Sequence, residues 1–348
     1  MGIISHWTFS VSGGLVLARP DRDGLFLLNP TAELIWNQYI RGLTAADSVH
    51  EFQAIFGIPP AIAQRDIEAT FAQWQAGLLS LATPPPPDPP RATPHPDALP
   101  IDCVLNGVRF RVLVAPGDLV DEIFPRLKHL AASFSVPDFT IAVNPTPDGL
   151  PATARMYLLD EMTRRCQPGR ESRAILHAGA CGTASACVLL AGATHSGKST
   201  LCAALMHAGF ICYSDDSSLL DLNFDVAGMP FPLMLREGSW SHFPHLQHSP
   251  TLTRFGVNIR FLPSNLPGTS PSVAPKALVF VQYQAGANPL IEQINTFDAL
   301  VALEKTGFWV EHRYDNIAAF LTWLGNLPKY RLAYSEFSDA MKFFRSLI

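Results

Sequence analysis

Residues 192 to 199 read Gly-Ala-Thr-His-Ser-Gly-Lys-Ser and fit the pattern G-x-x-x-x-G-K-[S/T] without a mismatch. In this pattern backbone N–H groups close around phosphate oxygens, and the positive end of the following helix adds to the attraction. Lys198 would bridge the β- and γ-phosphates of ATP, and the Ser199 hydroxyl would ligate Mg²⁺. The predicted nucleotide-binding residues are Gly192, Ala193, Thr194, His195, Ser196, Gly197, Lys198, Ser199 and Thr200.

Two adjacent carboxylates follow the apolar segment 210–213, which is predicted to be a strand. In an open α/β sheet, ligands bind at the carboxyl ends of the strands. One carboxylate of such a pair can take the proton from an attacking hydroxyl while the other holds a metal ion. Paired acids are more often a solvated turn, but Asp215 and Asp216 come only seventeen residues after Lys198. That spacing favours a place in the nucleotide site.

His177 stands fifteen residues before Gly192, at the end of the apolar run 174–176. An isolated histidine beside a strand is usually structural, and here the spacing to the loop argues for a role in the site. The elements that position the loop are also visible. Residues 186–191 form an apolar run typical of a buried strand, and residues 200–207 have the composition of a helix.

Together, His177, the glycine-rich loop and the acidic pair resemble the carboxy-terminal domain of HPr kinase/phosphorylase and its relatives, which share their P-loop with the phosphoenolpyruvate carboxykinases. The likeness extends loosely from about residue 101 to the end, where 330–348 is predicted to be a closing strand and helix. It implies transfer of a phosphoryl group from ATP to a hydroxyl. In that reaction Asp215 is the expected base, Asp216 the expected metal ligand, and His177 lies near the γ-phosphate or the acceptor. The order of the two aspartate roles stays open.

One segment departs from that family. A glycine-rich signature tied to reverse phosphorolysis is missing after the acidic pair, and residues 232–240 read Pro-Leu-Met-Leu-Arg-Glu-Gly-Ser-Trp instead. This segment looks more like divergent kinases of peptide-modification gene sets, which argues against phosphorylase activity and against HPr as substrate. Arg236 could stabilise transferred phosphate charge and Glu237 could assist the metal, and an exposed ion pair explains both equally well.

The first part of the chain has the pattern of a small winged-helix unit. Apolar residues at 15–17 and 25–28 flank a turn at 21–24, which predicts a hairpin. Three short helices follow, and each has a start signal and a terminal glycine or loop. The predicted signals are Asn29 and Pro30 for the first helix, Thr44 to Gly57 for the second and Pro60 to Gly77 for the third.

Residues 14–79 also resemble the PqqD-like proteins, through "LNPTAELIW", "GLTAADSV" and "WQAGLL". The resemblance implies that a leader peptide adds as an extra strand to the hairpin and lies against the third helix. DNA binding is the rival function of a winged helix, and a packing domain without a ligand stays open. The charge argues against DNA binding, because residues 1–82 contain four basic and seven acidic residues, which gives a net charge of -3.

Composition completes the division of the chain. The proline-rich stretch 83–100 cannot form a helix or a sheet ladder, so we predict a semi-rigid linker between a domain at 1–82 and a kinase-like domain at 101–348. Alternating apolar residues at 104–114 predict strands, and 119–132 an amphipathic helix. The predicted class is α/β: a mixed sheet of the HPr-kinase type preceded by a small α+β winged-helix domain.

Charge and cysteine usage exclude several function classes. A net charge of -5 offers no general attraction for nucleic acid or an anionic membrane, and no segment is long and apolar enough to span one. Without a recognisable signal peptide we expect a cytoplasmic location. Six cysteines without a Cys-x-x-Cys pair argue for core thiols. His242, His245 and His248 could suggest zinc, and a mobile loop explains them better because Pro244 interrupts the run.

These observations lead to one expected function and two alternatives. The expected function is a kinase that captures a precursor peptide through residues 1–82 and phosphorylates one of its Ser or Thr hydroxyls. The alternatives are a kinase of a small metabolite such as a sugar, and a non-enzymatic scaffold that ATP switches. The sequence leaves the acceptor and the oligomeric state, including a homo-oligomer, open.

Overall fold

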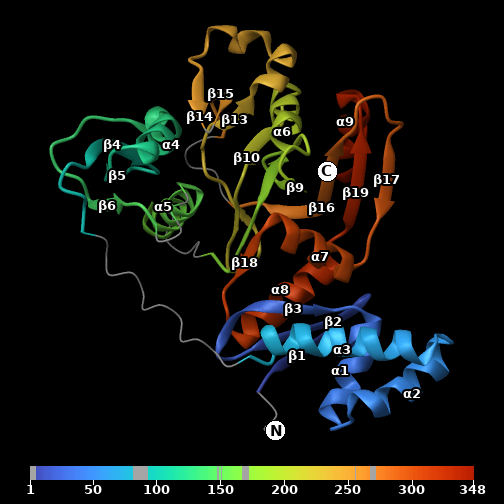
Figure 1. Cartoon of the computed structure of the whole chain (residues 1–348). Helices are drawn as coiled ribbons and strands as arrows, with labels where there is room; N and C mark the ends of the chain where they lie inside the picture. The colour runs from blue at the N-terminus through green and yellow to red at the C-terminus, as the bar shows by residue number, and fades with distance from the viewer. Residues whose placement is uncertain are drawn as a thin grey trace. The chain divides into compact units, whose positions relative to one another are not determined.

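The computed structural model describes residues 5–80, 93–146, 149, 151–166, 172–254, 256–266 and 272–348 (Figure 1). It is a mixed α/β structure with several sheets. The chain divides into two compact units. The first holds the described part of Met1–Pro87 together with Asn295–Val301 and His312–Asn326, and the second holds the described parts of Asp88–Ile294, Ala302–Glu311 and Leu327–Ile348.

The first unit has an antiparallel sheet, and its described strands are ordered β1-β2-β3. The predicted hairpin is confirmed as β2 (Gly14–Arg19) and β3 (Arg22–Leu28). The sequence prediction of only two strands was wrong, because β1 (Trp7–Val11) pairs with β2 along its whole length. The strand alternates half-buried Trp7 and Phe9 with exposed hydroxyl residues, a period of two that identifies a strand.

Three helices follow the sheet, and local capping sets their limits. The Asn29 side chain accepts a hydrogen bond of 2.8 Å from Ala32 N, which satisfies one of the free N–H groups at the helix start. Thr44 and Asp47 form a reciprocal capping box, and Gly57 adopts a left-handed φ of 63° after the second helix. The predicted starts and stops are confirmed. The helices are α1 (Pro30–Ile40), α2 (Ala45–Phe56) and α3 (Pro60–Ala76).

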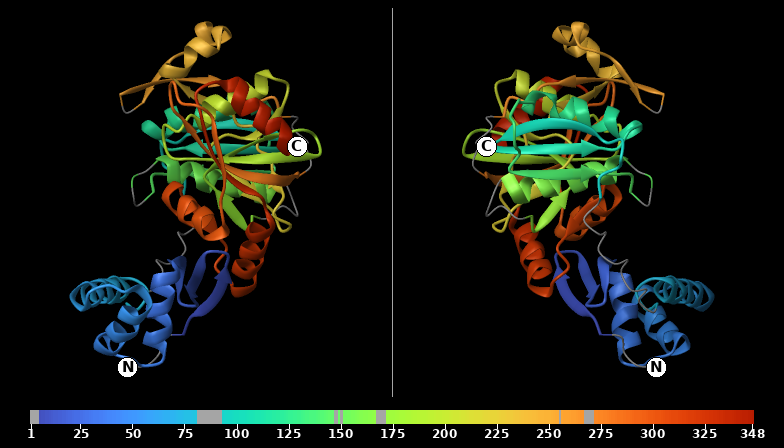
Figure 2. Two further views of the ribbon diagram at one scale, coloured as in Figure 1. Left: turned by 90° about the vertical axis from the view of Figure 1, so that its right-hand side faces the viewer. Right: turned by 90° about the vertical axis from the view of Figure 1, so that its left-hand side faces the viewer.

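The sheet of the first unit is covered on both faces. Leu15 and Leu17 of β2 pack into the core formed with the helices, so Val16 and Ala18 face the opposite side. All four are buried. That opposite side borders α8 (Tyr314–Asn326) (Figure 2). The Tyr314 ring lies 5.8 Å from the Trp7 ring and 5.2 Å from the Phe9 ring. The unbroken apolar run of β2 reflects burial on two faces.

The second unit is built around a sheet whose described strands are ordered β10-β8-β9-β16-β19-β17. β9, β16 and β19 are parallel, whereas β8, β10 and β17 pair antiparallel with their neighbours. Because β10 and β9 are both antiparallel to β8, they point the same way and end at the same edge. The predicted strands near 186–191, 210–213 and 330 are confirmed. The strands are β8 (Ala178–Gly182), β9 (Ala186–Ala191), β10 (Ile211–Ser214), β16 (Ala274–Tyr283), β17 (Leu290–Gln293) and β19 (Lys329–Tyr334).

Two helices pack on this sheet through one apolar core, which contains Leu201, Leu205 and Phe344. One follows the glycine-rich loop and the other closes the chain, as predicted. Among the described helices, none combines the length and apolar composition that a bilayer crossing requires. The two helices are α6 (Lys198–His207) and α9 (Phe337–Leu347), and a further helix is α7 (Thr296–Thr306).

A separate small sheet precedes the large one, with strand order β4-β5-β6 and its own apolar core. The strands predicted at 104–114 and the helix predicted at 119–132 belong to it; the helix ends at Leu127 and continues as a 3-10 turn. Residues 83–92 of the predicted linker lie outside the described residues, and Pro100 lies in edge strand β4, where its missing N–H is tolerated. The elements are β4 (Leu99–Leu105), β5 (Val108–Val114), β6 (Phe139–Val143), α4 (Asp118–Leu127), η1 (Lys128–Leu130) and α5 (Pro151–Cys166).

Two further sheets complete the second unit, with orders β12-β11-β7-β18 and β13-β15-β14. The strand predicted at 174–176 is β7. His177 therefore directly follows a strand of a different sheet from the one that carries the glycine-rich loop. The elements are β7 (Ala174–Leu176), β11 (Ser218–Leu220), β12 (Val226–Ala227), β18 (Phe308–Val310), β13 (Leu233–Arg236), β14 (Leu252–Arg254), β15 (Val257–Leu262), η2 (Glu237–His242) and η3 (Pro244–His248).

Candidate functional site

The glycine-rich loop joins the carboxyl end of β9 to the first residue of α6. At two positions of this loop, steric constraints explain why the residue is glycine. A Cβ at Gly192 would lie 2.8 Å from the carbonyl oxygen of Val281, and Gly197 has a left-handed φ of 88°. The Ser196 hydroxyl is buried and has no hydrogen-bond partner among the described groups. The loop therefore holds a tight turn with polar groups left for a ligand.

A cavity of about 500 Å³, open to solvent, lies over this loop. The loop residues 193–200 line it together with His177, Asp216 and Arg236, so the structure brings most of the predicted site residues to one place. Lys198 is only 7% exposed and lies at the base of the helix. A second, smaller cavity shares Ser199 and Asp216 with the first and adds Asp215.

Asp216 is the centre of a cluster of cationic groups. Its Oδ1 lies 3.8 Å from Lys198 Nζ and 3.5 Å from His177 Nε2, and its Oδ2 accepts a hydrogen bond of 2.5 Å from Arg155. Burial alone would raise the pKa of Asp216, but the charges of Arg155, His177 and Lys198 lower it to about 2. Asp216 is therefore a carboxylate at any physiological pH. Burial lowers the pKa of His177, and the neighbouring charge of Asp216 opposes this shift.

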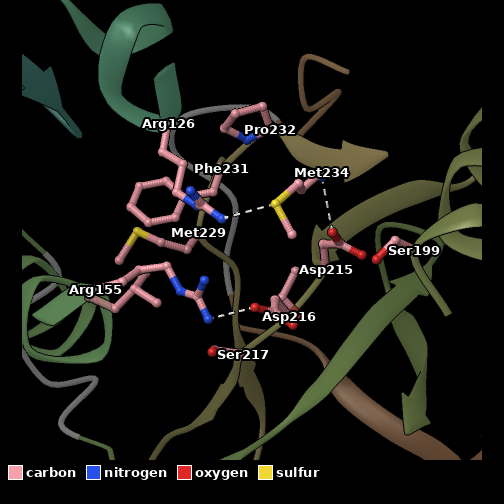
Figure 3. Close-up of a pocket in the computed structure, with 12 residues that line it drawn as sticks. Arg126, Arg155, Ser199, Asp215, Asp216, Ser217, Met229, Phe231, Pro232 and Met234 are labelled. Atoms are coloured by element: carbon pink, nitrogen blue, oxygen red, sulfur yellow. Dashed lines mark hydrogen bonds and ion pairs between the residues drawn. The ribbon is translucent and has the colours of Figure 1, made fainter. Parts of the chain in front are cut away.

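Asp215 has the opposite environment although it is the next residue. Its Oδ2 accepts a hydrogen bond of 3.2 Å from Met234 N, and its Oδ1 is buried without a partner among the described residues (Figure 3). Burial, followed by the neighbouring Cys202 and Asp216, raises the pKa of Asp215 to about 7, against an opposing hydrogen bond from Ser199. Adjacent acids with separated pKa values are the arrangement that general acid–base chemistry uses.

Arg236 and Glu237 were both predicted as site residues, and the structure places them differently. The Arg236 guanidinium lies 2.7 Å from His195 Nε2 and lines the cavity. Glu237 instead accepts a hydrogen bond of 3.1 Å from Asn258, and it is not among the residues that line either described cavity.

Sequence reasoning missed Arg155, which α5 brings from the small sheet to Asp216 (Figure 3). Its other terminal nitrogen lies 2.9 Å from Glu122 of α4, which also pairs with Arg126 at 3.1 Å. Glu122 is fully buried. The available signal was Glu122, a charged residue within the helix predicted at 119–132. A buried charged residue usually has a partner of opposite charge, and here that partner is Arg155.

Aromatic side chains line the same cavity beside the loop. Tyr283 ends β16, the strand next to β9, and its N–H donates to the Ser196 carbonyl oxygen at 2.8 Å. Its ring is 45% exposed and lies edge-to-face with Tyr334, with 5.8 Å between the centroids. Phe337 completes this side. An exposed ring beside the glycine-rich loop can stack on a planar ligand.

The cysteines and the segment with His242 and His245 have structural surroundings. All six cysteines are buried and free, which confirms the prediction of core thiols. The Sγ atoms of Cys181, Cys202 and Cys212 lie within 4.8 Å of one another, but they are part of the apolar core, where cysteine behaves as a small hydrophobe. The predicted loop at His242 and His245 is instead folded as the 3-10 turns η2 and η3.

Comparison with known proteins identifies one part of the chain. Residues 14–78, which run from β2 to just beyond α3, match the family described as Coenzyme PQQ synthesis protein D (PqqD). No curated protein matches the chain. The amino-terminal part of this protein is therefore a PqqD-like domain, in agreement with the resemblance in its sequence.

Proposed function

We propose that this protein is an ATP-dependent kinase that transfers the γ-phosphoryl group to a Ser or Thr hydroxyl of a peptide held by its PqqD-like domain. One observation carries the proposal. At the end of the glycine-rich loop, Lys198 and a permanently ionised Asp216 lie beside Asp215, whose pKa of about 7 suits a general base.

The residues at the loop fit the nucleotide and its metal. The turn at Gly192 has no room for a side chain, and the buried Ser196 hydroxyl lacks a partner among the described groups, as expected of a loop shaped around phosphate. A hydroxyl at Ser199 and a carboxylate at Asp216 are oxygen ligands of the kind Mg²⁺ prefers. Bound Mg²⁺ would neutralise phosphate charge. The ring of Tyr283 would cover the base.

Asp215 would take the proton of the acceptor hydroxyl. Near neutral pH a substantial fraction of Asp215 is ionised, and the ionised form binds a proton far better than an ordinary carboxylate. Asp216 is a much weaker base, because its neighbours lower its pKa to about 2. The different environments of the two residues support Asp215 as the base and Asp216 as the metal ligand.

The PqqD-like domain would supply the acceptor. β3 is the last strand of its sheet, and its outer edge has no strand partner in the described part of the chain. Leu25, Phe26 and Leu27 are half-buried there, so an extended peptide could add main-chain hydrogen bonds and apolar contacts together. The opposite edge strand, β1, packs against α8 instead. A bound peptide would raise the local concentration of acceptor hydroxyls.

The test is transfer from γ-labelled ATP by the full chain in the presence of Mg²⁺ and peptides encoded beside its gene. Label on a Ser or Thr of a peptide supports the proposal. Label on a soluble metabolite instead would point to a small-molecule kinase, and ATP binding without any transfer to a switched scaffold. If the wild-type protein failed to bind Mg²⁺·ATP, all three hypotheses, the peptide kinase, the small-molecule kinase and the ATP-switched scaffold, would be wrong.

A further inference from the structure

Arg155 has no role in the function proposed so far, yet it is the group closest to Asp216. Its side chain is 8% exposed, and it contributes to the lining of both cavities at the site. One terminal nitrogen donates to Asp216 Oδ2 at 2.5 Å and the other to Glu122 Oε1 at 2.9 Å. Its Nε is buried without a partner among the described residues. The guanidinium is thus fixed and still has a donor to offer.

Arg155 lies between two carboxylates, Glu122 and Asp216, and Asp216 belongs to the candidate site. Glu122 is shared by Arg126 and Arg155, so one buried carboxylate serves two guanidinium groups. The other terminal nitrogen of Arg155 is directed at Asp216. A buried arginine is costly unless it is paired, so Arg155 needs an anion at this position. Burial disfavours its charged form, but Asp216 and Glu122 hold the pKa of Arg155 above its ordinary value.

Asp216 occupies the place of an anion among groups that bind phosphate. Lys198 and His177 approach Oδ1, while Arg155 donates to Oδ2. If Asp216 held Mg²⁺, the cations around it would need another partner, and the terminal phosphoryl oxygens would supply one. The interaction between Arg155 and Asp216 is then a stand-in for the interaction between Arg155 and phosphate.

We propose that Arg155 is a catalytic residue whose guanidinium binds the transferring phosphoryl group and neutralises the charge that develops there. This inference rests on the proposed kinase function. In the step, the acceptor oxygen forms a bond to the γ-phosphorus and its proton passes to Asp215. The bond from that phosphorus to the β,γ-bridging oxygen breaks, and its electron pair leaves with ADP. Arg155 keeps its protons throughout and acts by electrostatics alone.

Arg236 is the competing candidate, because it also lines the cavity. It is half-exposed and its guanidinium lies against the His195 ring. Arg155 is buried and fixed by two carboxylates. A charge acts more strongly on a transition state when water is excluded and no reorganisation is needed. The structure therefore favours Arg155 for the charge-stabilising role.

The test measures how aluminium fluoride changes the affinity for Mg²⁺·ADP, since the fluoride complex imitates the transferring group and no acceptor is required. In wild type, fluoride should tighten ADP binding strongly. In Arg155→Lys the tightening should fall by about 100-fold or more, in line with the thousand-fold or larger contributions of arginines in phosphoryl transfer. The affinity for Mg²⁺·ADP without fluoride should change by less than about threefold, because ADP lacks the phosphoryl group that Arg155 would bind.

Arg165→Lys is the matched control, because Arg165 lies on the same helix as Arg155 and pairs with Glu161 at 2.8 Å. It should keep the wild-type tightening. Arg155→Ala is the second variant. It leaves room for a free guanidinium ion, and millimolar guanidinium chloride should restore its tightening, which no merely structural role would predict.

The outcomes separate the two claims. If fluoride increases the affinity for Mg²⁺·ADP equally in wild type and in Arg155→Lys, the proposed role of Arg155 is wrong while the kinase proposal survives. If guanidinium fails to restore Arg155→Ala although that variant is folded and binds ADP, the role is also wrong. If wild type shows no tightening at all, the proposed kinase function fails and the role of Arg155 fails with it.

Discussion

The loop edge of the six-stranded sheet and the outer edge of β3 are assigned binding roles for opposite reasons. At the first, Lys198, Arg155 and His177 converge on one carboxylate from three different elements. At the second, no charge cluster is needed, because the donors and acceptors belong to the main chain of β3. A site for group transfer requires matched, desolvated charges, whereas a site for an extended peptide requires an unpaired backbone beside apolar side chains. Single side-chain changes should therefore abolish the first function and only weaken the second.

The largest effect is expected from Lys198→Ala. It removes the ammonium group that we propose binds the β- and γ-phosphates, so labelled phosphate transfer should fall by about a thousandfold or more. Lys342→Ala is the control, since Lys342 is a surface lysine at 78% side-chain exposure. Full transfer by a folded Lys198→Ala protein would contradict the site.

Asp215→Asn should follow, with a fall in transfer of about 10² to 10⁴-fold, because an amide cannot accept the proton of the acceptor hydroxyl. The amide oxygen can still accept the hydrogen bond from Met234 N, so the fold should be kept. Affinity for Mg²⁺·ADP, measured by calorimetry, should change little. Retained transfer with unchanged pH dependence would show that Asp215 is not the base.

A change at the β3 edge should have a smaller and different effect. Leu25→Glu places a charge where an apolar peptide residue would lie, which should raise the KM for peptide by about tenfold, or about 1.4 kcal/mol. The rate at saturating peptide should stay the same, because the chemistry is elsewhere. Ile55→Glu, at an exposed position of α2 in the same unit, is the matched control. Equal changes in KM for the two variants would argue against peptide capture at β3.

The smallest effect concerns stability without nucleotide or metal. The pKa of Asp215 is raised from 3.8 to about 7 in the folded chain, so its contribution to stability is complete below pH 4 and is lost as the pH rises toward 7. Asp216 is ionised throughout this window, because its pKa is about 2. The stability of wild type relative to Asp215→Asn should thus fall between pH 4 and pH 7 by on the order of a few kcal/mol. Parallel curves from thermal or urea unfolding would refute this account.

Local patterns allowed many elements to be predicted. The limits of α1, α2 and α3 follow from caps at Asn29 and Thr44 and from glycines after the helices, interactions that span only a few residues. The strand before the glycine-rich loop was readable because its apolar run is continuous. β1 was missed because it is only five residues long, although it alternates and Gly13, with a left-handed φ of 97°, marks the turn before β2.

By itself, the sequence determined the glycine-rich loop with its strand and helix, the acidic pair that follows, and the PqqD-like domain, because each is a continuous segment with its own spacing. Only the tertiary structure decided that Arg155 reaches Asp216 over 61 residues, that Glu122 holds Arg155, and that α8 covers the second face of β2. Pairs of this kind are created by shared burial and complementary charge. Burial and charge pairing depend on which elements pack together, and no fixed interval along the chain records that.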